Sequence, residues 1–566
     1  MELNFENKYK DRTPEETCAI IKDFFISRGY TIDIFPLKSD IELYSYHILL
    51  KKNGFIVLFS NGKGMTDAYA EASGLAELYE RFCNFGVYMW SPMFWEKRKE
   101  LGINFNNEAK LNLDDILNIP IINQRILKLG QHNPDKAHSL LNDMKYNDFF
   151  GVPYTIIESN ETIYLDPVVI TKINLSTGMS AGNTFEEAFV QGSSEILERF
   201  VTYNFFINPP KKLYQINDNI LSMSLQEKIK KLNSQDKQVY IFDLSYNYML
   251  PVVLTLVIDK KRHFSRINFA SNPIFEIAVE RTFTEMYQNV STMIEKWIGI
   301  QTPYYMFSGE KILYDNATGL RDVAIFPEYL LNNIEIISKC GNYFNDNSFS
   351  NIDIFKWMKK LFNDAKIDIC YRDCSLSNQI TALHIVALNL SVNYDVPIQM
   401  KEKDWIDYQK RYDAFNSIFK ELIKEKYNLS TILNKVDYLL PSSQNSSFYW
   451  EIAARDCTNP LETRSTDILY IIFEHFNVPN DMINVYSDSI YYYQLMKFIF
   501  IKDYLRAKYS AEEIIDYGEI FGFSDIKFAD IENINNFEYL LEEIWVKPIH
   551  SFYHSRIYEE IIRSFV

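Results

Sequence analysis

Gly64–Phe85 (GMTDAYAEASGLAELYERFCNF) and Gly182–Phe205 (GNTFEEAFVQGSSEILERFVTYNF) are two versions of one segment. The offset is constant, 182 − 64 = 118, and it aligns Glu77-x-x-Glu80-Arg81-Phe82 with Glu195-x-x-Glu198-Arg199-Phe200. A third segment follows 90 residues later and matches Ala188, Gln191, Glu195 and Glu198 with Ala278, Arg281, Glu285 and Gln288. Self-similarity at such long spacing predicts a fold built on an internal repeat.

Each copy has the spacing of an amphipathic helix, and the positions that repeat are the polar ones. Ser73, Glu77, Glu80 and Arg81 fall at i, i+4, i+7 and i+8, which places them on one helical face. A face that is merely solvated does not require the same polar residue at the same turn. The repeat therefore predicts that three polar faces meet at one site, and the alternative is three separate surface faces.

Six carboxylates would gather where these helices meet: Glu77, Glu80, Glu187, Glu195, Glu198 and Glu285. Like charges repel strongly at low dielectric, and oxygen-only ligands favour Mg²⁺ over zinc as the ion that relieves the repulsion. The interleaved arginines Arg81, Arg199 and Arg281 indicate an anionic ligand. Thr66 and Thr184 are good N-caps preceded by glycines, and Thr184 with Glu187 has the form of a capping box. Together these features predict a magnesium–triphosphate site, with a two-metal hydrolase as the alternative.

Composition excludes several other classes of protein. The chain has 566 residues and a formal charge of 58 − 75 = −17, which disfavours direct binding to nucleic acid. Six cysteines are too few for a disulfide framework, and the longest apolar runs are too short to span a bilayer. The polar N-terminus shows no signal-peptide core, so we expect a cytoplasmic protein. The 39 tyrosines and 41 phenylalanines are compatible with aromatic surface, and we expect a homodimer. All eight histidines lie outside the three motifs, and we assign none of them a catalytic role.

Residues 1–400 alternate helix-like and strand-like segments, which predicts an α+β fold. We expect helices at residues 17–28, 66–87, 184–205 and 273–293, strands at 46–50, 55–59, 240–244 and 251–258, a hairpin within 153–170, and irregular structure over 97–150. Beyond residue 400 the apolar positions recur in steps of four and three, as at Tyr408, Tyr412, Phe415, Phe419 and Leu422. The sequence thus predicts one domain over 1–400 and an all-helical C-terminal domain over 401–566.

The three motifs resemble the ATP-binding motifs of YcaO proteins. The resemblance includes Ser73-x3-Glu77-x2-Glu80-Arg81, Ser180-x6-Glu187-x3-Gln191 and Arg281-x3-Glu285, the connecting stretches Asn61–Gly64 and Ser176–Thr184, and Lys10 with Thr17 near the N-terminus. It implies a YcaO-type domain that binds ATP and Mg²⁺ between helices. The length and the helical C-terminus are similar to those of the stand-alone bacterial members of the family.

The resemblance also implies roles for individual residues. The six glutamates resemble the carboxylates on the metal side, whereas Asn183, Gln191, Arg199 and Arg281 resemble phosphate contacts. Lys10 and Thr17 resemble nucleoside contacts, and Arg81, Ser73 and Ser180 are expected to contact the ligand or to cap a helix. Glu80, Glu198, Arg199 and Arg281 are the residues that we expect to be catalytic.

Many YcaO proteins phosphorylate the oxygen of a backbone amide in a peptide; a nucleophile then attacks the carbon, and phosphate leaves. The resemblance implies this reaction here. The implied substrate is a peptide or protein, and the stand-alone type is associated with β-methylthiolation of a ribosomal protein beside a radical methylthiotransferase. Two alternatives stay open: an azoline- or thioamide-forming enzyme that acts with a partner, and a nucleotide-binding accessory factor without chemistry of its own.

Overall fold

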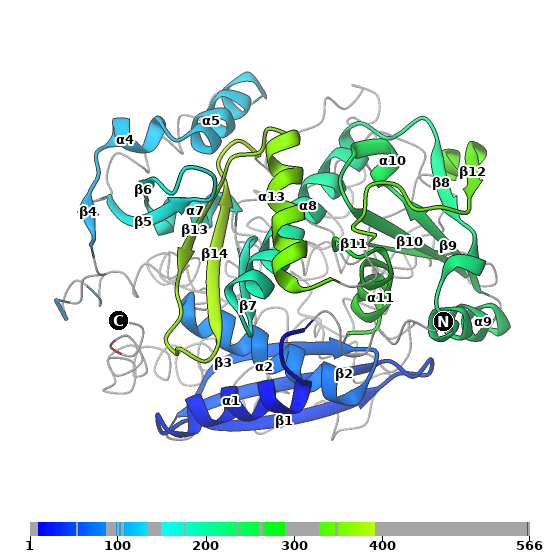
Figure 1. Ribbon diagram of the computed structural model, residues 1–566, viewed down its shortest axis with the longest axis horizontal. Coiled ribbons are helices and arrows are strands. Elements are labelled where there is room, and N and C mark those ends of the chain that lie inside the picture. Colours follow the sequence, from blue (N-terminus) through cyan, green and yellow to red (C-terminus); the bar gives the residue numbers. More distant parts are fainter. Residues whose placement is uncertain are drawn as a thin grey trace, which may run out of the picture.

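The computed structural model describes residues 10–52, 55–85, 107–132, 149–174, 176–235, 237–259, 264–288, 328–345 and 349–390, together with residues 98, 101–102 and 563. The expected helical domain at 401–566 and its boundary lie outside these residues, apart from residue 563. Within them, helices and sheets are mixed, which confirms the α+β fold (Figure 1).

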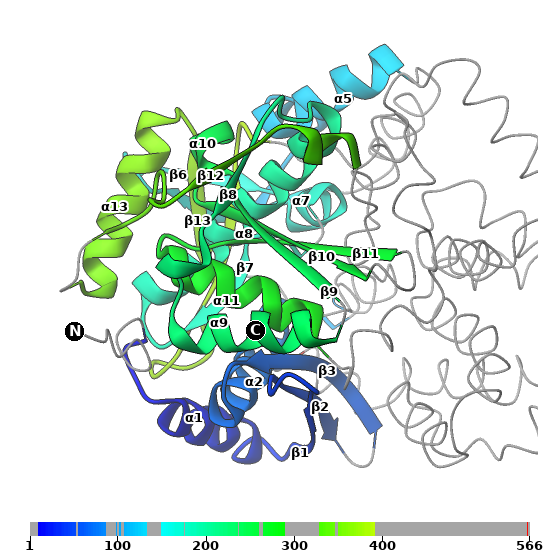
Figure 2. The same cartoon turned by 90° about the vertical axis from the view of Figure 1, so that its right-hand side faces the viewer.

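The first repeat unit is a small sheet that carries two helices. Helix α1 (Pro14–Ile26) begins at a capping box of Thr13 and Glu16. The antiparallel strands β1 (Thr31–Lys38), β2 (Tyr44–Lys52) and β3 (Phe55–Gly64) follow, and helix α2 (Asp67–Cys83) begins where β3 ends. Figures 1 and 2 show α1 and α2 on this sheet at the bottom of the molecule.

The second unit centres on a six-stranded sheet of order β4-β5-β13-β14-β7, in which β6 also pairs with β5. Its strands are β4 (Ala109–Lys110), β5 (Phe150–Ile156), β6 (Thr162–Leu165), β7 (Met179–Gly182), β13 (Ile369–Asp373) and β14 (Thr381–Ala387). The accompanying helices are α4 (Leu113–Leu117), α5 (Pro120–His132), α7 (Pro167–Asn174) and the long α8 (Phe185–Ile207), which begins where β7 ends.

The third unit contains a five-stranded sheet of order β11-β10-β9-β8-β12. Its strands are β8 (Leu213–Ile216), β9 (Lys237–Asp243), β10 (Val252–Asp259), β11 (Phe264–Ser271) and β12 (Ile334–Ile337), and its helices are α9 (Met223–Ser234), α10 (Ser245–Tyr248) and α11 (Phe275–Met286). Helix α11 begins just after β11, as α2 follows β3 and α8 follows β7. Helix α13 (Asn351–Asp364) packs on α8.

The three motif helices close a ring. Each helix packs on the strand that leads into it and also on the strand of the next unit: α2 contacts β7, α8 contacts β11, and α11 contacts β3. This cyclic packing brings the polar faces of α2, α8 and α11 together, although residues 80 and 285 are about 200 positions apart in the chain. The sequence prediction that the three repeats converge is therefore confirmed at the level of the fold.

Two glycines at equivalent positions make this packing possible. A Cβ on Gly64 would lie 2.6 Å from the backbone nitrogen of Ala70, and one on Gly182 would lie 2.4 Å from that of Ala188. Because Ala188 follows Ala70 by the repeat offset, the same contact of strand end with helix occurs in both units. The glycines thus let each strand end approach its own helix, and both also lie in the wall of the cavity described below.

Most expected elements are present. The helices at 17–28, 66–87, 184–205 and 273–293 correspond to α1, α2, α8 and α11, with the part of the last beyond residue 288 outside the described residues. Two expectations are wrong. The interval 97–150 contains α4 and α5, and residues 167–170 begin helix α7 instead of ending a strand. Asp166 directly precedes α7. Its carboxylate accepts hydrogen bonds from the N–H groups of Val168 and Val169 and so starts a helix in a stretch of β-branched residues.

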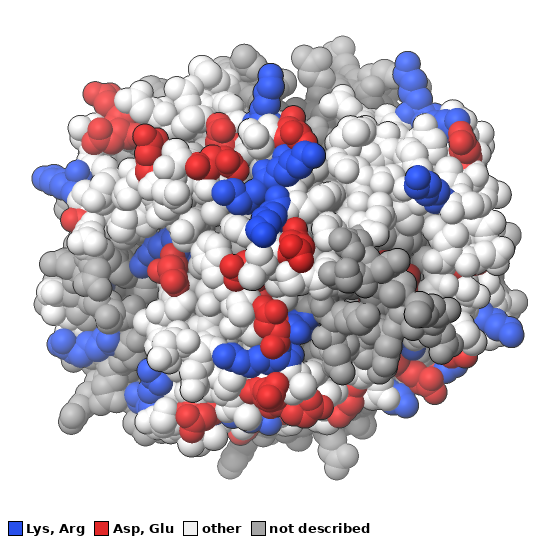
Figure 3. Space-filling model, viewed as in Figure 1, with Lys and Arg blue, Asp and Glu red and all other residues white. Residues whose placement is uncertain are grey.

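The surface carries charges of both signs. On the face that carries α13, acidic and basic side chains lie next to each other (Figure 3). Among the described helices, none is long and apolar enough to cross a membrane. All five cysteines within the described residues are free thiols.

His384 makes stability depend on pH. It lies buried on β14 with Nδ1 2.8 Å from the Tyr154 hydroxyl, and burial, assisted by Arg372, lowers the pKa of His384 to about 3. A lowered folded-state pKa means that the stabilisation is complete above pH 6.5 and is lost as the pH falls, because the unfolded state then binds the extra proton. In His384→Asn, which cannot titrate, we expect a flatter fall in the unfolding free energy from pH 7 to pH 5, by up to about 1.4 kcal/mol per pH unit.

Urea unfolding of both proteins at pH 7, 6 and 5 measures this slope. Parallel pH profiles for the two proteins would contradict the assignment.

Candidate functional site: a charged cavity at the centre of the ring

The three motif helices line a cavity of about 1500 Å³. Fourteen of the fifteen residues that the sequence singled out for the site lie in its wall: Lys10, Thr17, Ser73, Glu77, Glu80, Arg81, Asn183, Glu187, Gln191, Glu195, Glu198, Arg199, Arg281 and Glu285. Helices α2, α8 and α11 contribute most of them, as the ring of packed units requires. The predicted convergence of carboxylates and arginines in one place is thus what the structure shows.

Equivalent glutamates each have a cationic neighbour. Glu77 pairs with Arg81 at 2.5 Å and Glu195 with Arg199 at 3.5 Å, both one turn apart on their own helices. Glu285, the third member, pairs instead with Lys63 at the end of β3. This last pair links the third unit to the first, so it also stabilises the closed arrangement of the three units.

One turn further along, Glu80 and Glu198 lie deeper. Burial raises the pKa of Glu80 well above its ordinary value, and the nearby carboxylates of Glu77 and Glu195 add to the shift. Burial also raises the pKa of Glu198, opposed by Arg199 and Arg281. Each carboxyl thus responds to charges on more than one helix. Their ionised forms are poorly solvated here, which is the condition under which a bound cation stabilises a site most.

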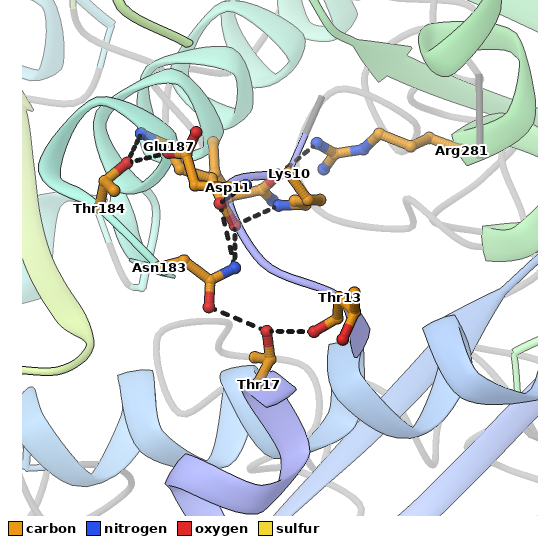
Figure 4. A network of polar contacts seen from close by, with 9 residues as sticks. Lys10, Asp11, Thr13, Thr17, Asn183, Thr184, Glu187 and Arg281 are labelled. Carbon is orange, nitrogen blue, oxygen red and sulfur yellow. Dashed lines mark hydrogen bonds and ion pairs between the residues drawn. The ribbon is translucent and has the colours of Figure 1, made fainter. Parts of the chain in front are cut away.

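The first turn of α8 holds the N-terminal segment (Figure 4). Lys10 Nζ lies 2.9 Å from Glu187 Oε1, and the N–H of Asp11 donates to Oε2 at 3.1 Å. Asn183 Nδ2 donates to the same carboxylate, while its Oδ1 accepts from the hydroxyl of Thr17 at 2.8 Å. Burial alone raises the pKa of Glu187, but Lys10, Asp11 and Asn183 outweigh it and the net pKa is lowered.

This network corrects the expected capping box. The Thr184 hydroxyl accepts from the N–H of Glu187, so the N-cap is present. The Glu187 carboxylate, however, turns to Lys10 and Asn183, and no reciprocal bond to Thr184 is formed among the described contacts. Sequence reasoning missed this because the partner of Glu187 lies 177 residues away in the chain.

Contacts between the units complete the wall. Arg281 on α11 donates to Gln191 on α8 at 2.8 Å, joining residues that occupy the same repeat position. Gln288 donates to the backbone oxygen of Asn61 at 2.7 Å, and the N–H of Asn61 lies 3.4 Å from Glu77 Oε2. Lys63 and Asn61 were not among the residues that the sequence singled out. Their place in the stretch Asn61–Gly64, between strand and motif helix, was the available signal.

Ser180 does not reach the cavity. It lies fully buried on β7, and a Cβ at Gly192 would come within 2.8 Å of its hydroxyl oxygen, so the side chain points into the packing between β7 and α8. The equivalent position in the first unit is Gly62, which packs in the same way on Gly74. The expectation that Ser180 contacts the ligand is not supported by this position, whereas Ser73 does line the cavity.

The donor set fits Mg²⁺. It consists of carboxylate and amide oxygens, which are the ligands that hard divalent cations prefer, and two of the carboxyls have raised pKa values through burial. Among the described residues, no three acidic, histidine or cysteine side chains are arranged to hold a metal as they stand. Lys10, Lys63, Arg81 and Arg199 each pair with one of the carboxylates.

The raised and lowered pKa values give opposite predictions for two glutamates on α8. Since the folded state disfavours ionised Glu198, Glu198→Gln should raise the melting temperature at pH 8 without metal or nucleotide by a few degrees, and the gain should shrink as the pH falls toward 5. Since the folded state favours ionised Glu187, Glu187→Gln should lower the melting temperature under the same conditions.

Thermal unfolding of the two variants and the parent chain measures both effects, and each variant is the control for the other. Equal destabilisation of both would show that Glu198 makes a favourable charge interaction that this electrostatic picture lacks.

Parts of this sequence are similar to those of known proteins. A family model described as YcaO cyclodehydratase, ATP- and Mg²⁺-binding, matches residues 61–390. The chain is 28% identical over 291 residues to an uncharacterized protein of Haemophilus influenzae, covering 50% of this chain and 49% of that one. It is also 28% identical over 290 residues to the ribosomal protein S12 methylthiotransferase accessory factor YcaO of Escherichia coli K12, covering 49% of each. The chain thus spans about half the length of these curated relatives.

Solved structures resemble it more distantly. A heterocyclase in complex with substrate and cofactor has a TM-score of 0.48 at 15% identity, covering 70% of this chain and 56% of that one. YcaO from Methanopyrus kandleri bound with AMPPCP and Mg²⁺ has a TM-score of 0.46 at 14% identity, covering 71% and 98%. Likeness at this level supports no inference, but the family model covers more than half of the chain. The chain belongs to the YcaO family, which binds ATP and Mg²⁺.

Proposed function

We propose that the protein is an ATP- and Mg²⁺-dependent enzyme that activates a backbone amide of a peptide or protein by phosphorylating its oxygen. One observation carries the proposal: the described wall of the cavity is rich in carboxylates, lysines and arginines and contains no cysteine or histidine. Such a wall suits phosphoryl transfer, in which positioning and charge stabilisation do most of the work and little covalent help is needed.

The chemistry explains why charge suffices. An amide resists attack because resonance protects its carbonyl carbon and its oxygen is a poor leaving group. Mg²⁺-ATP supplies the phosphoryl group that makes this oxygen a good leaving group. A nucleophile then adds to the carbon, and the oxygen departs as part of inorganic phosphate. The protein has to bind both reactants, exclude water and stabilise negative charge.

The ion pairs of the cavity suit an exchange of partners. Lys63, Arg81 and Arg199 neutralise glutamates, and an exchange of partners would make them available to phosphate oxygens. The released carboxylates, with Glu80 and Glu198 beneath them, would hold Mg²⁺. Arg281 on α11, held by Gln191, and Asn183, held by Glu187 and Thr17, would orient the phosphates. In this proposal Lys10 and Thr17 contact the nucleoside, and Glu80, Glu198, Arg199 and Arg281 are catalytic.

The cavity has space for a second reactant. Its volume of about 1500 Å³ exceeds the roughly 300–1,000 Å³ of a typical pocket for one small molecule. The wall also contains apolar residues, among them Leu221, Phe275 and Phe349. A peptide segment beside the nucleotide would bury side chains against this apolar part.

We propose to test a ribosomal protein first as the substrate. In this proposal the chain acts in β-methylthiolation, as a cytoplasmic homodimer beside a radical methylthiotransferase. The Escherichia coli relative is named an accessory factor of a ribosomal protein S12 methylthiotransferase. The same name supports the second candidate, in which this chain presents a partner without modifying it. Azoline or thioamide formation would use the same activation with a different nucleophile.

Isotope transfer separates these functions. Ribosomal protein S12 with ¹⁸O in its backbone carbonyls is incubated with the protein and Mg²⁺-ATP, and the released phosphate is analysed by mass spectrometry. We expect one ¹⁸O atom in part of the phosphate. Arg281→Ala should reduce the labelled phosphate by at least about 100-fold, as expected when a charged contact made in the transition state is lost.

A variant outside the cavity, Lys359→Ala on α13, is the matched control and should behave as the parent chain does. Phosphate release that S12 stimulates, but that remains unlabelled, would favour the accessory role over amide activation.

A further inference from the structure

Strand β2 carries a histidine directly behind the cavity wall. His47 pairs in register with Asn61 on β3, and its Nδ1 lies 2.7 Å from Asn61 Oδ1. The imidazole lies near the rings of Phe35 and Phe59, with centroids 6.4 Å and 6.0 Å away, and so occupies a defined position on the sheet. His47 itself does not line the cavity, whereas Asn61 does.

The backbone of Asn61 is bonded to motif helix α2 and to the residue segment that follows α11. Its N–H lies 3.4 Å from the Glu77 carboxylate on α2, and its carbonyl accepts from Gln288, two residues after the end of α11. The neighbouring Lys63 pairs with Glu285. Asn61 therefore lies where the first and third units meet, close to the carboxylate of Glu77 and to the ion pair of Lys63 with Glu285.

The state of the imidazole decides which way the Asn61 amide points. Burial lowers the pKa of His47, opposed by the hydrogen bond to Asn61, so the ring is neutral at neutral pH and carries one N–H. Nε2 is buried and has no hydrogen-bond partner within the described part of the chain. If the proton were there, a buried donor would be left without an acceptor, and orphaned N–H groups are rarer than unsatisfied acceptors. The proton therefore belongs on Nδ1, where Asn61 Oδ1 accepts it.

Because its side-chain oxygen accepts from His47, Asn61 can use its NH₂ group for another hydrogen bond. Within the described residues, this group has no hydrogen-bond partner. Asn61 lines the cavity. A neutral double donor at this place suits a phosphate oxygen, and unlike a lysine it does not compete for the carboxylates.

We infer that Asn61 donates through its side-chain amide to the phosphate part of the bound nucleotide, and that His47 is the positioning residue that fixes the orientation of this amide. His47 touches no ligand and acts only through Asn61. The inference depends on nucleotide binding, which the family assigns, and it stands or falls independently of the amide chemistry proposed above.

A double-mutant cycle on the intact chain tests this. The probe is Mg²⁺ with the non-hydrolysable analogue AMPPCP, and its dissociation constant is measured by titration calorimetry. Asn61→Ala should weaken binding about tenfold or more, the range for a hydrogen bond to a charged group. His47→Phe keeps an aromatic ring near Phe35 and Phe59 but removes the donor, and it should weaken binding about fivefold. The double variant should bind no more weakly than Asn61→Ala alone.

His47→Asn is the rescue variant. An asparagine amide places a donor near the position of Nδ1, so binding should return to within about twofold of the parent chain. His47→Gln places its amide one bond further out, near the position of Nε2, and should stay as weak as His47→Phe; the Asn–Gln pair also serves as the test if the phenylalanine variant does not fold.

Additive losses in the double variant would overturn the inference, since His47 would then act on the site by another route. Equal affinity of the asparagine and glutamine variants, or an unchanged affinity in Asn61→Ala, would overturn it as well.

Discussion

The structure depends on one packing constraint: each motif helix must cover its own strand and the strand of the following unit. Because α2 reaches β7, α8 reaches β11 and α11 reaches β3, none of the three units buries its motif helix alone. The apolar faces of the helices satisfy this requirement, and their opposite faces are thereby turned toward one another. The charged cavity is a consequence of the way in which the core closes.

Electrostatics then decides how so many carboxylates share the cavity. At the rim, Glu77, Glu195 and Glu285 each pair with a lysine or arginine, which lowers the cost of placing like charges together. Deeper in the wall, Glu80 and Glu198 have raised pKa values because burial outweighs the nearby cations. Charge is therefore balanced at the edge of the site, whereas ionised carboxylates at its base are unfavourable. A bound cation would stabilise these carboxylates, and an anion bound with it would pair with the lysine and arginines at the edge.

The repeat in the sequence predicted the helices and their convergence because periodicity and repeated polar residues are local signals. It also placed Glu187, Gln191 and Arg281 in the site. It could not predict the partners of these residues, since Lys10 with Glu187 and Lys63 with Glu285 are joined only by the closed ring. Ser180 was misplaced for a related reason: its hydroxyl is polar in sequence, but the close approach of β7 to α8 at Gly192 buries it. His47 gave no signal at all, because its role exists only through its partner across the sheet.

The third unit departs from the other two in one residue at the base of the cavity. At the repeat position of Glu80 and Glu198, the third unit has Gln288, which lies just after α11 and is bonded to the backbone of Asn61 instead of contributing charge. Three identical units around an axis would offer a ligand three equivalent poses, and an elongated molecule would be distributed among them. The three units are not identical: one repeat position holds Ser73, Gln191 and Arg281, and Gln288 makes the negative field at the base uneven as well. A ligand with one charged end and one uncharged end therefore has a preferred direction of entry.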